Sequence, residues 1–208
     1  QLETLTIGAS IETIGRFAFQ TNHITELTLP DGVVVGEEAF ALNQIAELTL
    51  PDNVVIGQQA FQSNGMTSLT IGQSNTIGAW AFYDNSIEIL TVPESAVVEK
   101  GAFLVNNIKE LSIQTRTISD FVFQHNQISE LSLPDNVTVG WQAFSDNPLF
   151  KGSVTFQGTY TVDPESFDGM AFISTGVDTV EDDQYRDLGL TSIHIPESVK
   201  TIGRHAFS

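Results

Sequence analysis

Apolar residues recur along this chain in a fixed unit, in which they alternate with polar residues. The stretch ELTLPDNVVIGQQAFQSN (47–64) closely matches ELTLPDGVVVGEEAFALN (26–43) and ELSLPDNVTVGWQAFSDN (130–147). Phenylalanines mark the units at intervals of 21, 21, 21, 21, 20 and 21 residues: Phe19, Phe40, Phe61, Phe82, Phe103, Phe123 and Phe144. Phe207 lies in the same column, and Phe167 fits it less well. The unit is I-x-x-L-x-L-P-x-x-V-x-I-G-x-x-A-F-x-x-N-x, so the chain is an array of internal repeats.

Each unit predicts two short strands joined by corners. The Leu-x-Leu alternation places both leucines on one face of a strand, and the following proline ends the strand because it cannot donate to a ladder. Val-x-Ile starts a second extended piece, and a glycine such as Gly57 permits a sharp corner after it. One such coil cannot enclose a core alone, so we expect stacked coils with the Phe column inside. The Asn column, three residues after each Phe, should be buried and bond backbone groups that the bends leave unpaired.

The repeats predict a mainly β fold in a single domain, 1–208: a solenoid of about nine short coils, with parallel strands and few or very short helices. Regular coils span 2–147, an irregular coil and an insertion span 148–189, and a final coil spans 190–208. The sixth coil departs from the unit in TISDFVF, where Ser119 and Val122 replace the Gly and the Ala. Neither end resembles the polar cap that usually terminates a solenoid, so we expect a fragment of a longer protein.

Charge narrows the range of partners. The formal net charge is −18, with only eight Lys and Arg, whereas nucleic acids and anionic membrane surfaces are bound by basic surfaces. We therefore expect no nucleic acid partner, and the lack of a long apolar run predicts no membrane insertion. Without cysteine, the chain has neither disulfides nor cysteine-ligated metal. Solubility is the simplest explanation of the acidity.

A column of hydroxyl residues follows the outer face of the predicted first strands. Threonine suits β-propensity and cross-strand packing, which is the simplest interpretation. There are two alternatives. The column could be an array that orders water, or it could form an acidic groove for a basic partner together with bordering carboxylates such as Glu47 and Asp52. The column consists of Thr6, Thr28, Thr49, Thr70, Thr91, Ser112, Ser132 and Thr155, with His194 at its end.

Four apolar residues break the polar pattern beside the Phe column. Most coils carry polar residues just before Ala-Phe and just after the Phe, whereas adjacent coils here place Trp80, Tyr83, Leu104 and Val105. These four are candidate partner-binding residues, because an exposed apolar patch on a soluble monomer marks a contact site. Alternatively, their side chains fold over the corner and extend the core. Further exceptions in these columns are Phe17, Leu42, Phe121 and Trp141.

No catalytic or metal-binding arrangement emerges from the sequence. The four histidines fall in different columns, and no two have a metal-ligand spacing. The acidic run Asp178, Glu181, Asp182 and Asp183 has carboxylates that calcium favours but lacks the spacing of a calcium loop, so a solvated acidic loop is the preferred interpretation. We therefore predict no enzyme activity, no cofactor and no metal site.

These columns resemble the leucine-rich repeat, in the L-x-x-L-x-L element and the Asn column. LTSIHIPESVKTIGRHAF (190–207) and LETLTIGASIETIGRFAF (2–19) are especially similar to the BspA-like type of bacterial and protist surface proteins. The inner coils are shorter than is usual in this family, and Asn stands where many relatives carry Cys. The resemblance implies a right-handed solenoid on a cell surface, often used for adhesion to host proteins or to other microbes. It implies no catalytic residues.

Two functions follow from the sequence and the resemblance. The first is a secreted or cell-surface module that binds a protein partner, such as a host matrix or receptor protein. We expect its signal and anchor to lie outside this chain, and we expect it to be a monomer. The second is a rigid spacer that presents another domain, since about nine coils at ~4.8 Å each span roughly 40 Å. The aromatic exceptions and the insertion favour the first function, and the uniform Thr and acidic columns favour the second.

Overall fold

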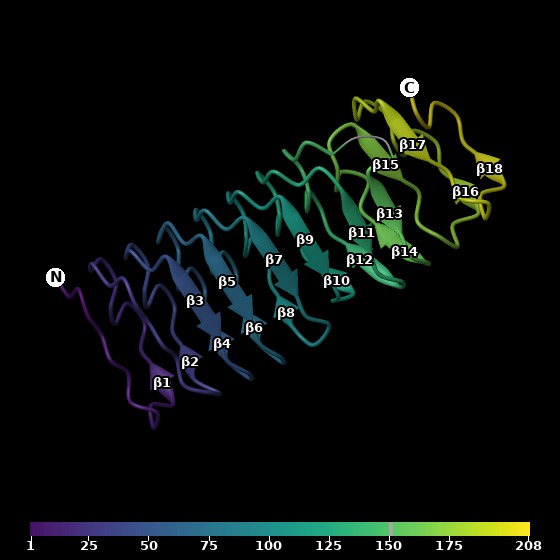
Figure 1. The fold of residues 1–208 in the computed structure, drawn as a ribbon. Coiled ribbons are helices and arrows are strands. Elements are labelled where there is room, and N and C mark those ends of the chain that lie inside the picture. Colours follow the sequence, from purple (N-terminus) through teal and green to yellow (C-terminus); the bar gives the residue numbers. More distant parts are fainter. Residues whose placement is uncertain (150–151) are drawn as a thin grey trace.

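The computed structural model describes residues 1–149 and 152–208. It shows a stack of coils with the two ends of the chain at opposite ends of the stack (Figure 1). The predicted mainly β solenoid with parallel strands is confirmed, and the described residues contain no α-helix. We number coils 1 to 8 by their phenylalanines from Phe19 to Phe167, and two final coils follow. Residues 150 and 151 of the predicted irregular coil lie outside the described residues.

Most coils contribute two strands to two separate layers. First strands follow the Leu-x-Leu motif: β3 (Glu47–Leu50), β5 (Ser68–Ile71), β7 (Ile89–Val92), β9 (Glu110–Ile113), β11 (Leu131–Leu133), β13 (Val154–Phe156), β15 (Met170–Phe172) and β17 (Ser192–His194). Second strands follow Val-x-Ile: β1 (Thr13–Ile14), β2 (Val34–Val35), β4 (Val55–Ile56), β6 (Thr76–Ile77), β8 (Val97–Val98), β10 (Thr117–Ile118), β12 (Val137–Val139), β14 (Tyr160–Val162), β16 (Thr179–Val180) and β18 (Thr201–Ile202). The second strands form sheets β1-β2-β4-β6-β8, β10-β12-β14 and β16-β18, and the first strands pair two by two.

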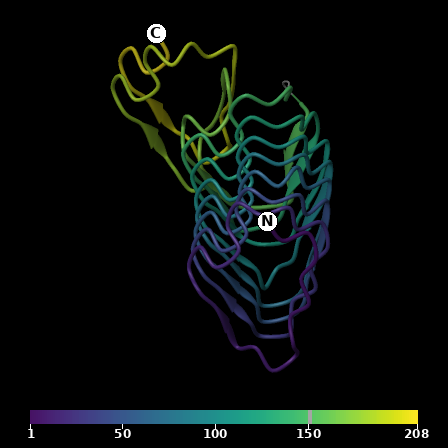
Figure 2. The same ribbon diagram turned by 90° about the vertical axis from the view of Figure 1, so that its left-hand side faces the viewer.

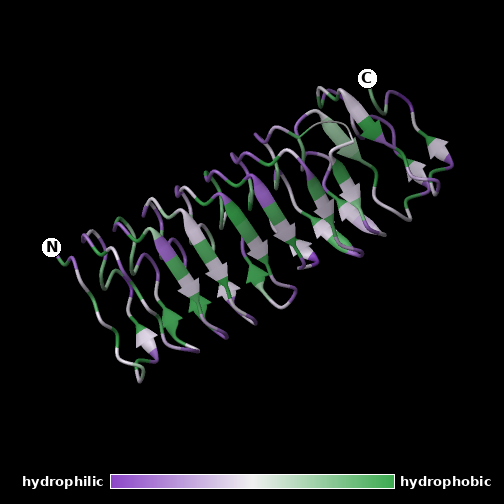
Figure 3. Ribbon diagram, in the orientation of Figure 1, coloured by the Kyte–Doolittle hydropathy of each residue, from purple (hydrophilic) through white to green (hydrophobic). Residues whose placement is uncertain are grey.

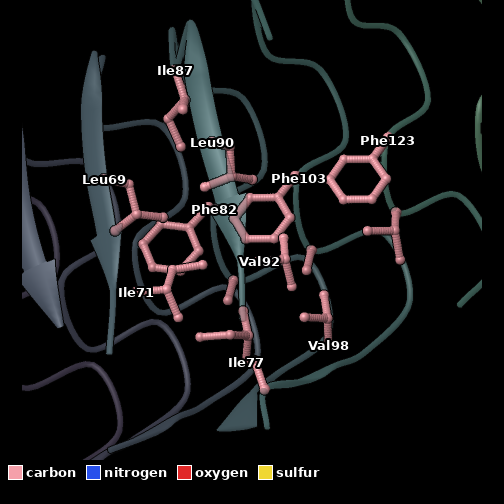
Figure 4. Packing of buried hydrophobic residues seen from close by; sticks show 14 of the residues in the cluster. Leu69, Ile71, Ile77, Phe82, Ile87, Leu90, Val92, Val98, Phe103 and Phe123 are labelled. Atoms are coloured by element: carbon pink, nitrogen blue, oxygen red, sulfur yellow. The ribbon is translucent and has the colours of Figure 1, made fainter. Parts of the chain in front are cut away.

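A stacked column of aromatic rings, which we call the spine, fills the core. Burial alternates along β3, β5 and β7 as the Leu-x-Leu pattern requires, and Figure 3 shows the same alternation in hydropathy. The rings from Phe19 to Phe167 stack with centroids 5.2–5.8 Å apart and planes within 18° of parallel. Figure 4 shows Phe82, Phe103 and Phe123 packed among the aliphatic side chains of both layers. Phe167, which matches the repeat less well in sequence, completes the spine.

The Asn column bonds neighbouring coils to one another, as predicted. Asn85 Nδ2 donates to the Phe82 carbonyl of its own coil at 3.1 Å and to the Phe61 carbonyl of the preceding coil at 3.0 Å. Its Oδ1 accepts the N–H groups of Asn64 at 3.1 Å and Met66 at 2.9 Å. One amide therefore satisfies backbone groups of two coils that the corner leaves without a ladder partner. The same bonds to two successive Phe carbonyls recur at Asn43, Asn64, Asn106, Asn126 and Asn147.

The sixth coil is one residue short, and the structure places the deletion at one corner. The corner between β9 and β10 comprises residues 114–116, whereas that between β7 and β8 comprises 93–96. In the described part of the chain no ladder pairs β8 with β10; instead Ser119 Oγ donates to the Val98 carbonyl at 2.7 Å. A shallow groove of about 460 Å³ follows this break, with Val97 and Arg116 on its walls. The short coil therefore divides the second-strand layer into two sheets.

Residues 168–189, predicted as an insertion, form a coil of their own. β15 pairs with β17 and β16 with β18, and the Tyr185 ring takes the spine position, 5.6 Å from Phe207. The two final coils have a small hydrophobic cluster separate from the main core, and Figure 2 shows them turned aside from the rest of the stack. The sequence conceals this coil because Glu181, Gln184 and Leu188 stand in the Gly, Ala and Asn columns.

Candidate functional site

The corner that carries the spine residue differs in sequence from coil to coil. We call it the corner face; in each coil it runs from three residues before the spine phenylalanine to two residues after it. Backbone hydrogen bonds join successive corners, such as Phe61 N–H to the Ala81 carbonyl and Phe82 N–H to the Ala102 carbonyl, at 2.8 and 2.9 Å. Residues at equivalent positions of neighbouring coils therefore lie side by side in columns.

Two backbone positions of the corner adopt the left-handed conformation in coils 1 to 7. They are the second residue before the spine phenylalanine and the second residue after it, and both Trp80 and Val105 have φ of 55°. Asp, Asn and His tolerate this conformation better than most residues, which fits Asp84 and Asp146 in the same column as Val105. Val105 is β-branched, so its residue type is unfavourable for a conformation that every coil requires.

The indole of Trp80 folds over the next coil. A Cβ atom at Gly101 would collide with the Trp80 ring, so the indole lies directly on the Gly101 backbone. Lys100 Nζ lies over the ring, 4.8 Å from its centroid. Trp80 is half-buried by these contacts. The glycine thus provides the space that the large side chain needs.

The other three predicted residues lie beside Trp80. Tyr83 N–H donates to the Trp80 carbonyl at 3.0 Å, and the carbonyls of Leu104 and Val105 accept N–H groups of coil 4 at 3.1 and 3.2 Å. All four side chains are half-buried. The structure therefore places Trp80, Tyr83, Leu104 and Val105 on the adjoining corners of coils 4 and 5, each with an exposure between that of a surface residue and that of a core residue. We call these four residues the apolar patch.

A second cluster, on coils 6 and 7, is missing from the predicted site residues. The rings of Phe121 and Trp141 meet edge to face, with centroids 4.9 Å apart and planes at 72°; we call them the aromatic pair. The Trp141 indole N–H donates to Glu165 Oε2 at 2.9 Å, and its backbone N–H donates to Asp120 Oδ1 at 2.8 Å. Both aromatic residues are visible in the sequence as apolar exceptions. Because they occupy different columns, the repeat alone does not place them in contact.

Several acidic side chains of the described residues have a hydrogen-bond or ion-pair partner at the surface. His125 Nδ1 lies 3.3 Å from Asp146 Oδ2, with both side chains about half exposed. In the acidic run, Asp182 Oδ1 accepts the backbone N–H of Arg204 at 2.6 Å. Its neighbour Asp183 pairs with an arginine three residues on, at 3.1 Å. Within 1–149 and 152–208, no three or more His, Asp or Glu side chains converge to hold a metal ion.

Three titratable groups have shifted pKa values: Asp135 at a corner, and the partly buried Tyr160 and Tyr185. Hydrogen bonds from the backbone N–H and hydroxyl of Thr159 lower the pKa of Asp135, and the nearby Arg116 acts in the same direction. Asp135 thereby links the corners of coils 7 and 8. Burial raises the pKa of Tyr160, whose hydroxyl has no hydrogen-bond partner, and that of Tyr185.

Comparison with known proteins identifies the repeat. The BspA-type leucine-rich repeat region matches this chain in six copies, over residues 1–76, 34–151 and 166–208. The chain belongs to the BspA-type leucine-rich repeat family. This BspA-type chain is also similar to a solved leucine-rich repeat protein from Bacteroides ovatus, with a TM-score of 0.65 and 19% identity. The likeness covers 100% of this chain and 58% of the other, so the chain spans little more than half of that protein's length. No curated protein matches the sequence.

The family and the fold indicate a broad class of function but no specific partner. Leucine-rich repeats of this type are typically non-catalytic and serve in protein–protein interaction. Among the described residues, no helix has the length and apolar character to cross a membrane. Residues that depart from the repeat, such as Trp80 and Trp141, distinguish individual coils of the stack from one another.

Proposed function

We propose that this chain is a non-catalytic, extracellular interaction module that binds a protein partner, as in adhesion to a host protein, through the apolar patch on coils 4 and 5. The observation that carries the proposal is Val105, a β-branched residue held in the left-handed conformation. Neighbouring coils place Asp84 and His125 at the equivalent position, so stacking does not require valine there. Backbone strain that the fold does not need is commonly retained at functional sites.

Composition and position support the same surface. Tryptophan and tyrosine are enriched among the residues that dominate protein interfaces, and Trp80 and Tyr83 lie on one corner with apolar neighbours from the next coil. The Gly101 backbone fixes the indole in place, which lowers the entropy lost on binding. BspA-type repeats are typically found on surface or secreted proteins, which favours an extracellular partner.

Surface binding to a panel of matrix and serum proteins at physiological salt tests this proposal. The parent chain is compared with the double variant Trp80→Ser/Tyr83→Ser. We expect saturable binding to at least one protein, lost by tenfold or more in the variant, because patches of this kind concentrate binding energy in a few aromatic residues. Binding that survives the double substitution would move the site away from the corner face.

Val105→Asn separates binding from stability. Asparagine fits the left-handed backbone, a gain of about 1 kcal/mol, which offsets the similar loss from removing a half-buried valine. We expect an unchanged melting temperature and weaker partner binding. An unchanged affinity in this variant would remove Val105 from the site.

A rigid spacer is the second candidate function. The unbroken spine from Phe19 to Phe167 favours it, because a continuous stack resists bending over its whole length. Failure of every panel member to bind the parent chain would favour this function over the first.

A further inference from the structure

Cations of this chain already lie over two aromatic rings of the corner face. The Arg16 guanidinium lies 5.2 Å from the centroid of Phe17, and Lys100 Nζ lies 4.8 Å from that of Trp80. Both cations come from the column that is three residues before the spine phenylalanine. The negative face of an aromatic ring attracts a cation, most strongly for tryptophan. Two aromatic rings of the corner face therefore each bind a cation of this chain.

The aromatic pair lacks such a cation. In the column that supplies Arg16 and Lys100, coil 6 has Asp120 and coil 7 has Trp141 itself. In the part of the chain that the structure describes, no Lys or Arg lies over the ring of Phe121 or Trp141. Trp141 is 40% exposed and Phe121 is half-buried. The rings are therefore held together and remain accessible.

Two carboxylates are fixed beside the pair. Asp120 accepts the backbone N–H of Trp141, and Glu165 accepts its indole N–H. Each hydrogen bond uses one oxygen, and both side chains are exposed to solvent. The arrangement combines aromatic faces and two negative charges within hydrogen-bond reach of the same residue. A cation bound here would neutralise charge in a chain whose net charge is −18.

We propose that Phe121, Trp141, Asp120 and Glu165 form a binding site for a cationic side chain of a protein partner, arginine in preference to lysine. A planar guanidinium stacks on aromatic rings and donates two parallel hydrogen bonds to a carboxylate, whereas an ammonium does only part of this. The acidic surface raises the encounter rate of a basic segment. The site adjoins the apolar patch on the same face, so this inference adds the partner's chemistry and to that extent rests on the proposed function.

Coil spacing sets the register of the partner segment. Trp80 and Phe121 occupy the same column two coils apart, which is about 10 Å at the usual separation of paired strands. Three residues of an extended peptide span a similar length. The partner segment should therefore carry an apolar residue for the patch and an arginine three residues away.

Binding of a blocked peptide with leucine and arginine in this register tests the site. The matched peptide replaces arginine by citrulline, which keeps the shape and removes the charge. We expect roughly millimolar affinity for the arginine peptide and about tenfold weaker binding of the citrulline peptide, by calorimetry. In NMR spectra the indole N–H resonance of Trp141, one of two tryptophans in the chain, should shift on titration with the arginine peptide.

Charge variants locate the contact. Asp120→Asn/Glu165→Gln keeps both hydrogen-bond acceptors for Trp141 and removes two charges, so it should fold normally and bind the arginine peptide about tenfold more weakly. Phe121→Leu keeps an apolar side chain, removes the ring and should weaken the same peptide. The control Glu26→Gln/Glu47→Gln removes two charges from the first-strand face and should change affinity less than twofold.

Several outcomes would overturn the inference. Equal losses in the two double variants would mean that only overall charge attracts the peptide, and equal affinity for citrulline would exclude a cation site. Displacement by choline at the peptide's own concentration would indicate a small ammonium ligand instead of a protein segment. If Trp80→Ser/Tyr83→Ser abolishes binding to a panel protein while Asp120→Asn/Glu165→Gln does not, the proposed function stands and this inference fails.

Discussion

Phe82 and Trp80 lie two residues apart in one corner but have opposite surroundings. Phe82 is fully buried between the rings of Phe61 and Phe103, 5.4 and 5.6 Å away. Trp80 is half-buried, with the Gly101 backbone on one side. The two aromatic residues therefore stabilise the fold to different extents.

Substitution of each residue should show this difference. Phe82→Ala leaves a cavity in the middle of the spine and should lower the free energy of unfolding by about 3–5 kcal/mol. Trp80→Ser removes a side chain that is already half in solvent, and we expect a loss of about 1 kcal/mol. Chemical denaturation of both variants measures the two values. Equal losses would show that Trp80 is a core residue and would weaken the case for the patch.

Asn85 should be as important as a spine residue despite its polarity. Asn85→Ala leaves the N–H groups of Asn64 and Met66 without partners, and it removes one of the two amide donors to each of two Phe carbonyls. Each unpaired N–H group costs about 1–3 kcal/mol, so we expect a decrease of about 2–6 kcal/mol in the free energy of unfolding by urea denaturation. The control is Asn107→Ala, at an exposed position directly after Asn106, the equivalent of Asn85 in the next coil. A loss below 1 kcal/mol for Asn85→Ala would mean that water replaces the amide.

For single residues, the sequence predicts the contacts that recur in every regular coil. It does not predict the backbone conformation of the residues that depart from the repeat. The spine and the Asn bonds follow from columns of one residue type. Tryptophan, valine and phenylalanine rarely adopt a left-handed conformation. The residue types of Trp80, Val105 and Phe121 therefore argue against the φ values that these residues have. Gly101 in the column of Trp80, and Gly169 and Asp84 in the column of Val105, are the residue types that indicate what the corner requires.

Between elements, close packing of coils depends on the glycine after the second strand. A Cβ atom at Gly57 would lie 2.7 Å from the Gly36 backbone and 2.8 Å from the Val35 carbonyl, both in the preceding coil. Backbone atoms cannot move aside as a flexible side chain does. The glycine therefore sets the distance between successive corners.

Gly57→Ala should force two coils apart. Overpacking of this kind destabilises by about 1–3 kcal/mol, and we expect that loss in thermal denaturation. Gly8→Ala is the matched control, because a Cβ atom at Gly8 meets nothing within 4 Å. If both substitutions have the same effect, the close approach at Gly57 is relieved by a small backbone shift.

The elements themselves are predictable where the repeat is regular. The interval of 20 residues before Phe123 indicates a shortened coil, but the sequence does not show that the deletion lies at 114–116 and separates β8 from β10. Residues 168–189 resemble an insertion because their Gly, Ala and Asn columns are occupied by other residues. Tyr185 occupies the spine position of this coil, and its ring packs there as a phenylalanine would. The Ala-Phe pair that marks most other coils is therefore absent from the sequence of this one.

Over the whole molecule, stability should be uneven. The main cluster extends from coil 1 to Met170, whereas the final coils bury a separate, much smaller set around Val180 and Tyr185. Few buried contacts mean a low free energy of local opening. The two final coils should therefore open before the rest of the stack.

Hydrogen exchange measures this difference. Amides of β15 to β18 should exchange at least tenfold faster than those of β3 to β9, a difference of about 1.4 kcal/mol in opening free energy. The regular coils provide the internal reference. Uniform protection along the chain would mean that the final coils unfold together with the main core.

Stacking also determines how the chain would respond to force. The two ends lie at opposite ends of the stack, so a pull on them loads the coils one after another. Each coil of 21 residues that detaches would release about 70 Å of extended chain. Under tension the solenoid would therefore lengthen in steps of about this size instead of giving way at once.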